Sequence, residues 1–161
     1  MEIYLLRHGI AEEQRAGARD SDRALTPEGK KRLRETLLVA KGAGVNPDLI
    51  LTSPYRRARE TAQIAAEVLG NRMPLVSVDA LTPMGDIREA WTEIRIHKDV
   101  RSILLASHEP LVGLLTGFLL NVPQLAIDVK KGCLVRVDVE SLSVQPRGVL
   151  KWMLTPRLAA R

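Results

Sequence analysis

Hydrophobic positions fall into two alternating patterns along the chain. Short apolar runs are typical of buried β-strands, and the stretches between them carry apolar residues three or four positions apart, as amphipathic helices do. Glycine and proline lie at most of the boundaries. The pattern predicts strands at 1–6, 48–52, 74–78, 102–107, 133–139 and 149–154, and helices at 27–43, 58–69, 86–97 and 110–120.

This order, in which strands and helices alternate before two final strands, is typical of an α/β domain. We expect three layers, α/β/α, around a mainly parallel sheet of about six strands with an antiparallel C-terminal part. The first strand is apolar on both faces, which predicts a central position. The chain of 161 residues has neither repeats nor linkers, so residues 1–161 are predicted to form a single domain.

Polar residues follow three of these strands. Arg7 and His8 come after the first, residues 53–57 after the second, and Ser107 and His108 after the fourth. If the strands are parallel, their ends share one edge of the sheet, where α/β proteins bind ligands. Guanidinium groups bind phosphate oxygens, and a neutral imidazole is a nucleophile. The convergence therefore predicts phosphoryl chemistry.

Charge and composition add two expectations. The net charge is +5 and aromatic residues make up 3%, but the basic residues are dispersed and their one cluster, residues 30–34, lies on the solvated face of an expected helix. We therefore predict no nucleic-acid partner. Residues 111–120 are too short an apolar run to cross a bilayer, and the N-terminal run leads into Arg7 rather than a signal sequence. The prediction is a cytoplasmic protein with no membrane partner.

Other catalytic designs fit the sequence less well. A metallophosphatase needs several grouped His and Asp ligands, whereas His8 and His108 stand beside cations, so no metal and no cofactor are expected. Ser53 and Ser107 lack the G-x-S-x-G context of a serine nucleophile and are expected to orient the site or cap helices. The lone Cys133 is predicted to be a buried apolar residue.

Three motifs in order resemble the histidine phosphatase (phosphoglycerate-mutase-like) superfamily. They are the R-H-G of residues 7–9, the S-x-x-x-R-A-x-x-T-A of residues 53–62, and the strand-terminal S-H of residues 107–108. Residues 25–29, 81–86 and 108–113 are further similar to the small SixA-type phosphohistidine phosphatases. The resemblance covers almost the whole chain and implies the phosphoglycerate-mutase-like fold.

The resemblance also implies roles for individual residues. His8 attacks phosphorus and becomes transiently phosphorylated, while Arg7, Arg57 and His108 hold the phosphoryl oxygens and stabilise the transition state. Arg23 is a further candidate for phosphate binding, with a surface ion pair as the alternative.

A proton donor is less easily assigned. Larger members of the family carry a glutamate after the third strand, where this chain has Leu81-Thr82-Pro83. Glu12, Asp86 and Glu109 lie near the right strand ends, but each also fits an ordinary role in a loop or helix cap. An alkoxide leaving group has a conjugate acid of pKa about 15.7, whereas imidazolium has a pKa of about 6.5. The missing glutamate therefore favours substrates with a P–N bond.

The predicted activity is removal of phosphate from phosphohistidine in a protein, for which a histidine phosphotransfer domain is one candidate partner. Two alternatives remain open at this stage. One is a phosphatase of small phosphoesters, and the other is a catalytically weak module that binds phosphate. The length of the chain favours a monomer.

Overall fold

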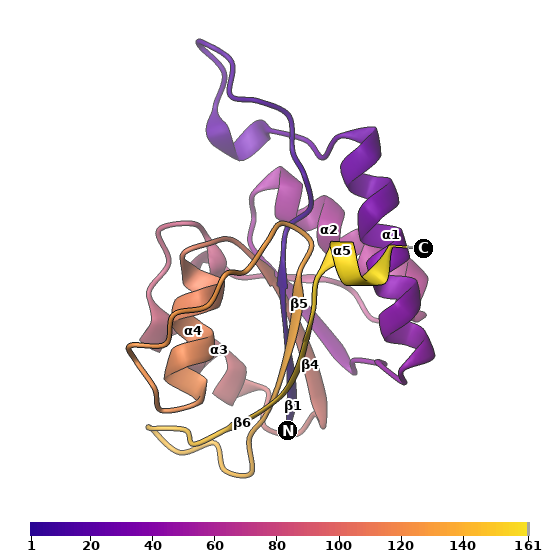
Figure 1. The fold of residues 1–161 in the computed structure, drawn as a ribbon. Helices are drawn as coiled ribbons and strands as arrows, with labels where there is room; N and C mark the ends of the chain where they lie inside the picture. Colours follow the sequence, from indigo (N-terminus) through magenta and orange to yellow (C-terminus); the bar gives the residue numbers. More distant parts are fainter. Residues whose placement is uncertain (161) are drawn as a thin grey trace.

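The computed structural model of the protein describes residues 1–160, and its strands join into one sheet in the order β3-β2-β4-β1-β5-β6 (Figure 1). β1, β2, β3 and β4 are parallel to one another, whereas β5 is antiparallel to β1 and β6 to β5. This confirms the predicted fold class and the central place of the first strand. The strands are β1 Glu2–Arg7, β2 Leu49–Thr52, β3 Val76–Ser77, β4 Ser102–Ser107, β5 Leu134–Asp138 and β6 Val149–Leu154.

Helices cover both faces of the sheet (Figure 1). One layer contains α1, α2 and α5, and the other contains α3 and α4. Two short 3₁₀ turns, η1 and η2, lie in the connecting loops. The helical elements are α1 Pro27–Gly42, α2 Arg56–Leu69, α3 Ile87–Ile96, α4 Leu111–Leu119, α5 Pro156–Ala159, η1 Asp20–Asp22 and η2 Asp79–Leu81.

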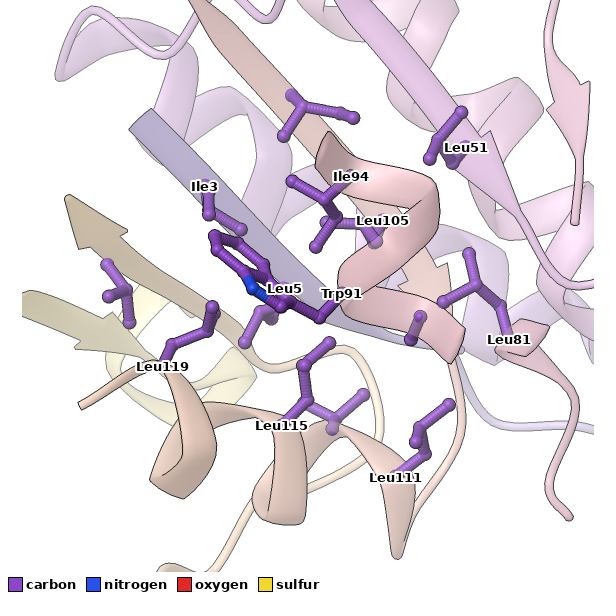
Figure 2. Close-up of a cluster of buried hydrophobic side chains, with 14 of the residues drawn as sticks. Ile3, Leu5, Leu51, Leu81, Trp91, Ile94, Leu105, Leu111, Leu115 and Leu119 are labelled. Carbon is purple, nitrogen blue, oxygen red and sulfur yellow. The ribbon is translucent and has the colours of Figure 1, made fainter. Parts of the chain in front are cut away.

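The two hydrophobic cores are built from alternate residues of the central strands. Ile3 and Leu5 of β1 pack with Trp91 on the α3–α4 side (Figure 2), whereas Tyr4 and Leu6 point into the core on the α1–α2 side. Burying an aliphatic side chain of this size contributes about 1.5–3 kcal/mol. Because β1 is buried on both faces, its carboxyl end is held rigidly, and this is the end that carries Arg7 and His8.

The helix boundaries follow the capping signals in the sequence. The Thr26 hydroxyl accepts a hydrogen bond from Gly29 N at 2.9 Å ahead of α1, and Gly70 ends α2 with φ of +80°. Asp86 caps α3 through its side chain, which accepts hydrogen bonds at 2.8 and 3.0 Å, the latter from Glu89 N. These helix ends were predicted correctly.

The second helix begins at Arg56 instead of residue 58, and the 3₁₀ turns η1 and η2 were not predicted. Two other elements differ more clearly from the prediction. The third strand was expected over 74–78 but comprises only Val76–Ser77, because β3 lies at the sheet edge and pairs on one side alone. The helix α5 was not predicted, although Thr155 and Pro156 repeat the cap-and-proline signal of α1, with the Thr155 hydroxyl accepting from Leu158 N at 3.2 Å. A helix this short leaves too little periodicity to be detected.

Candidate active site

The ends of β1, β2 and β4 meet at the carboxyl edge of the sheet. Hydrogen bonds continue past the strands, because His8 N donates to Ser107 O at 2.9 Å and Ser53 N donates to Ala106 O at 3.0 Å. The rings of His8 and His108 consequently lie next to each other, tilted by 57° and with their centroids 5.0 Å apart. The sequence-based expectation that the polar strand ends converge is correct.

His8 is buried and held in one tautomer. Its Nδ1 lies 2.7 Å from the carbonyl oxygen of Gly9, and because a carbonyl only accepts, Nδ1 carries the proton and Nε2 presents a lone pair. Arg57 Nε donates toward that Nε2 at 3.4 Å. Burial, with the nearby Arg57 charge, lowers the pKa of His8 to about 4, although the Gly9 bond acts in the opposite direction. The imidazole is therefore neutral and nucleophilic at pH 7.

His108 is oriented as a hydrogen-bond donor. Its Nε2 lies 2.8 Å from the Ser53 hydroxyl, and that oxygen also accepts from Tyr55 N at 3.2 Å. When the hydroxyl donates its own proton to Nε2, the proton of His108 lies on Nδ1, and this is the tautomer that offers the unpartnered Nδ1 to a ligand as a donor. Burial, followed by the charges of His8 and Arg57, lowers the pKa of His108 to about 3. His108 is therefore a neutral imidazole with an N–H available to a ligand.

Arg57 is anchored from two directions in the first turn of α2. Its Nη1 donates to the backbone oxygen of Asp20 at 2.9 Å, and its Nη2 pairs with the Asp20 carboxylate at 3.1 Å. The backbone of the same turn is held by Thr61, whose hydroxyl donates to Arg57 O at 2.7 Å and accepts from Gly9 N at 3.2 Å. Arg57 is only 4% exposed as a whole residue, and its guanidinium lies close to Nε2 of His8.

Arg7 contributes a second guanidinium. Its Nη1 donates to Val129 O at 2.8 Å. Within residues 1–160, Arg7 Nε and His108 Nδ1 are the buried side-chain atoms without a hydrogen-bond partner. An unpaired buried donor costs about 1–3 kcal/mol. Arg7 helps to lower the pKa of both site histidines, and the ring of His108 lies beside that of His8, so these donors suit an anion bound beside His8.

A glycine turn before β5 fixes the backbone of Arg7 and His8. Gly132 has φ of +78°, and its N–H donates to both Arg7 O at 3.1 Å and His8 O at 3.0 Å. A residue with a Cβ would be strained at that φ. The next residue, Cys133, accepts at its oxygen from Arg7 N and is fully buried, and burial raises the pKa of its thiol to about 11. Cys133 is therefore the apolar core residue that was predicted.

Asp20 is the site residue that sequence reasoning missed. Partial burial raises the pKa of Asp20, but the hydrogen bonds from Arg57 and Arg23 outweigh this and lower the pKa, so the Asp20 carboxyl is ionised. Arg23 itself pairs with Asp20 Oδ1 at 2.8 Å and donates to Glu12 O at 3.0 Å. The geometry thus gives Arg23 the ion-pair role, and its contact with phosphate stays a prediction.

The three candidate acids are each engaged elsewhere or exposed. Glu12 is exposed on the loop after β1, and Asp86 caps α3. Glu109 Oε1 accepts from Gly113 N at 2.6 Å in the first turn of α4. None of these carboxyls is hydrogen-bonded to His8 or His108 in the part of the chain that the structure describes.

Residues 1–160 contain neither a metal-binding cluster nor a membrane-spanning helix. His, Cys, Asp and Glu side chains do not gather there in groups of three or more that could hold a metal ion. Within the same residues, every helix is too short or too polar to cross a membrane.

Two comparisons of sequence place the chain among known proteins. Residues 3–86, more than half of the chain, match the family described as the histidine phosphatase superfamily, branch 1. The phosphohistidine phosphatase SixA of Escherichia coli strain K12 is 33% identical over 119 residues, which cover 73% of each protein. The family match includes Arg7, His8 and Arg57 but ends before His108.

Solved structures extend the similarity to the whole chain. The structure of the protein histidine phosphatase SixA complexed with tungstate superposes with a TM-score of 0.87 and 28% identity, over 98% of both chains. The alpha-ribazole phosphatase of Shigella flexneri shares the fold, with a TM-score of 0.71 and 17% identity over 97% of both chains. The site holds two buried imidazoles and two guanidiniums at the strand ends. The family match over residues 3–86 and the similarity to E. coli SixA show that the chain belongs to the histidine phosphatase superfamily, branch 1.

Proposed function

We propose that this protein removes phosphoryl groups from phosphohistidine in proteins, through a covalent phosphohistidine on its own His8. The observation that carries the proposal is the buried Nε2 of His8, which is deprotonated and directed at the space beside Arg57. The names of two relatives agree with it: SixA of E. coli is a phosphohistidine phosphatase, and the solved SixA holds tungstate, an oxyanion shaped like phosphate.

In the first step, the lone pair on His8 Nε2 attacks phosphorus. The new P–N bond forms as the bond from phosphorus to the substrate imidazole breaks, and the bond electrons leave with that imidazole. Charge on the equatorial oxygens is stabilised by N–H groups of Arg7, Arg57 and His108. The Gly9 carbonyl accepts from Nδ1–H and so stabilises the positive charge that the phosphorylated ring acquires.

In the second step, water attacks the phosphoryl group on His8. Its oxygen bonds to phosphorus while the P–Nε2 bond breaks, which returns the electron pair to the ring and releases inorganic phosphate. The proton lost by water passes to the phosphate product or to solvent. His8 is then neutral again, as its lowered pKa requires.

The leaving group decides which substrates are turned over. Glu12, Asp86 and Glu109 are exposed or hold helix N-termini, and Asp20 is kept ionised by its arginine partners. None of these four carboxyls is therefore available as a strong acid for an alkoxide, whereas imidazole takes its proton from solvent near neutral pH. This supports P–N substrates over alkyl phosphoesters.

The test compares a phosphohistidine protein with phosphoserine and a sugar phosphate under identical conditions. We expect kcat/KM to be higher for the phosphohistidine protein by at least about a hundredfold, as a general acid typically contributes 10²–10⁴-fold. Equal or faster turnover of the esters would favour the small-molecule phosphatase instead.

A labelling experiment separates the enzyme from a module that only binds phosphate. An acid-labile phosphoryl label is expected on the wild type after rapid quenching, and its loss is expected in His8→Ala. Tight phosphate binding without any label would overturn the enzymatic proposal. The protein partner, a monomeric state and a cytoplasmic location remain predictions from the sequence.

A further inference from the structure

We propose that a cationic groove beside the active site docks an acidic surface of the phosphorylated protein, next to its phosphohistidine. This inference rests on the proposed function, and it specifies the class of protein that serves as substrate. We define the basic groove as the hollow lined by Arg7, Ile10, Arg32, Asp128, Lys130, Lys131, Thr155, Pro156 and Arg157.

The basic groove starts at the active site and leads away from it. Arg7 lines both the basic groove and the active site. Burial is the main cause of the lowered pKa of His8, and Lys131 is near enough that its charge adds to this shift. The far side is formed by α1 and by α5, which lies alongside it (Figure 1). The groove has a volume of about 530 Å³, and a second hollow of about 480 Å³ shares Arg32, Pro156 and Arg157 with it.

The charges along the groove are unbalanced. Lys130 pairs with Asp128 at 2.9 Å and Arg32 with Glu28 at 2.8 Å. Lys131 and Arg157 are exposed and have no carboxylate partner within residues 1–160. A row of unpaired cations leading to a phosphoryl site attracts a partner with negative charge beside its phosphate.

The lining of the groove indicates a protein rather than a small molecule. The groove carries the long, exposed cationic side chains of Lys131 and Arg157, which can contact several carboxylates of a broad protein surface at once. It has no aromatic residue among those that line it, so a nucleobase would find no ring to stack on. Its volume also exceeds what a phosphoryl group occupies, and carboxylates on a protein surface match its length and charge.

A neighbouring hollow differs in character, which gives the docked protein an orientation. It has a volume of about 560 Å³, shares Asp128 with the basic groove, and is also lined by Glu109, Leu114, Leu125 and Ile127 of α4 and its flanking loops. Leu114 is 48% exposed. A substrate protein would therefore present acidic residues toward α1 and α5 and apolar residues toward α4.

The experiment uses two synthetic peptides of equal length with one central histidine, phosphorylated chemically by phosphoramidate. One peptide has glutamates flanking the histidine, and the other has glutamines at the same positions. The wild type is expected to prefer the acidic peptide by about tenfold in kcat/KM at low salt, since each exposed ion pair contributes about 0.2–1 kcal/mol. The preference should shrink as salt rises.

The variant Lys131→Glu/Arg157→Glu is expected to reduce the acidic-to-neutral ratio to about one or below, mainly through KM. Its matched control is Arg72→Glu/Lys151→Glu, which makes the same change in net charge with exposed residues outside the groove and should keep the preference. A wild type that hydrolyses both peptides equally, or a control that loses the preference as fully as the groove variant, overturns the docking proposal. Failure to hydrolyse either peptide would instead overturn the proposed function.

Discussion

The active site combines two regions that are held together in opposite ways. We call Arg7, His8, Arg57 and His108 the site floor, and Arg23, Lys131 and Arg157 the site rim, with Asp20 at the junction between the two. The floor lies at strand and helix ends and is fixed by backbone carbonyls, hydroxyls and burial, whereas the rim is held by partly or fully exposed ion pairs or by none.

This difference separates chemistry from recognition. Interactions in a buried, low-dielectric floor are strong and insensitive to salt, while exposed charges are screened within about 10 Å at 0.1 M salt. Substitutions in the floor should therefore change kcat, and those in the rim should change KM and the response to salt. The four predictions below test this division, from the largest expected effect to the smallest.

Arg57→Ala should have the largest effect. Removing a preorganised donor to the phosphoryl oxygens is expected to lower kcat by about 10²–10³-fold, and Arg57→Lys should recover little, because a single ammonium cannot replace the guanidinium fork that Asp20 holds. Steady-state kinetics on a phosphohistidine peptide provides the measurement. Full activity in Arg57→Lys would show that only charge matters there.

The second-largest effect is expected from acid pH, which should lower the free energy of unfolding of the protein through the buried histidines of the floor. The pKa of His8 is about 4 in the fold against about 6.5 unfolded, so between these values the unfolded chain binds more protons. The free energy of unfolding therefore falls as pH drops from 6.5 toward 4, by roughly 2 kcal/mol at pH 5 for His8 alone. His108, with a pKa of about 3, acts in the same direction.

Urea denaturation from pH 7.5 to 4.5 measures this loss. The variant His108→Gln lacks one titrating group and should show a shallower fall over the same range. An identical slope in the variant would mean that His108 is not buried in its neutral form.

Asp20→Asn tests the junction between floor and rim. Asp20 is a positioning residue, because it holds Arg57. It belongs to η1, in the long segment between β1 and α1 (Figure 1). We expect a fall in kcat of about tenfold, the equivalent of 1.4 kcal/mol, with partial recovery in Asp20→Glu. A purely structural role would instead lower the melting temperature and leave kcat unchanged, and thermal unfolding of the variants distinguishes the two.

Arg23→Ala should have the smallest effect. Its ion pair with Asp20 is partly exposed, and such pairs contribute about 0.2–1 kcal/mol. We expect kcat to change by less than about threefold, with inhibition by inorganic phosphate unaltered. A clear weakening of phosphate inhibition would instead support the phosphate contact predicted from the sequence.

The floor could be predicted from the sequence because it depends on local order. Each of its residues ends or directly follows a strand, or lies in the first turn of the helix after it, and parallel strands end at the same edge. The rest depends on how distant loops meet. Asp20 is one of several acids in a loop without periodicity, and only the folded path of that loop selects it. Gly132 contacts residues that precede it by more than 120 positions, which no local pattern reveals.

The hydrogen bond between His8 Nδ1 and the Gly9 carbonyl has a regiochemical consequence for any form of this protein that is phosphorylated on His8. Two positional isomers of phosphohistidine exist, one for each ring nitrogen, and they differ in chemical lifetime and in their reaction with isomer-specific antibodies. In the proposed mechanism the phosphoryl group is carried on Nε2, because the Gly9 carbonyl holds the proton on Nδ1, so the chain would make a single isomer. The group that selects it belongs to the main chain, and the choice is therefore encoded in the path of the backbone at the strand end rather than in any side chain.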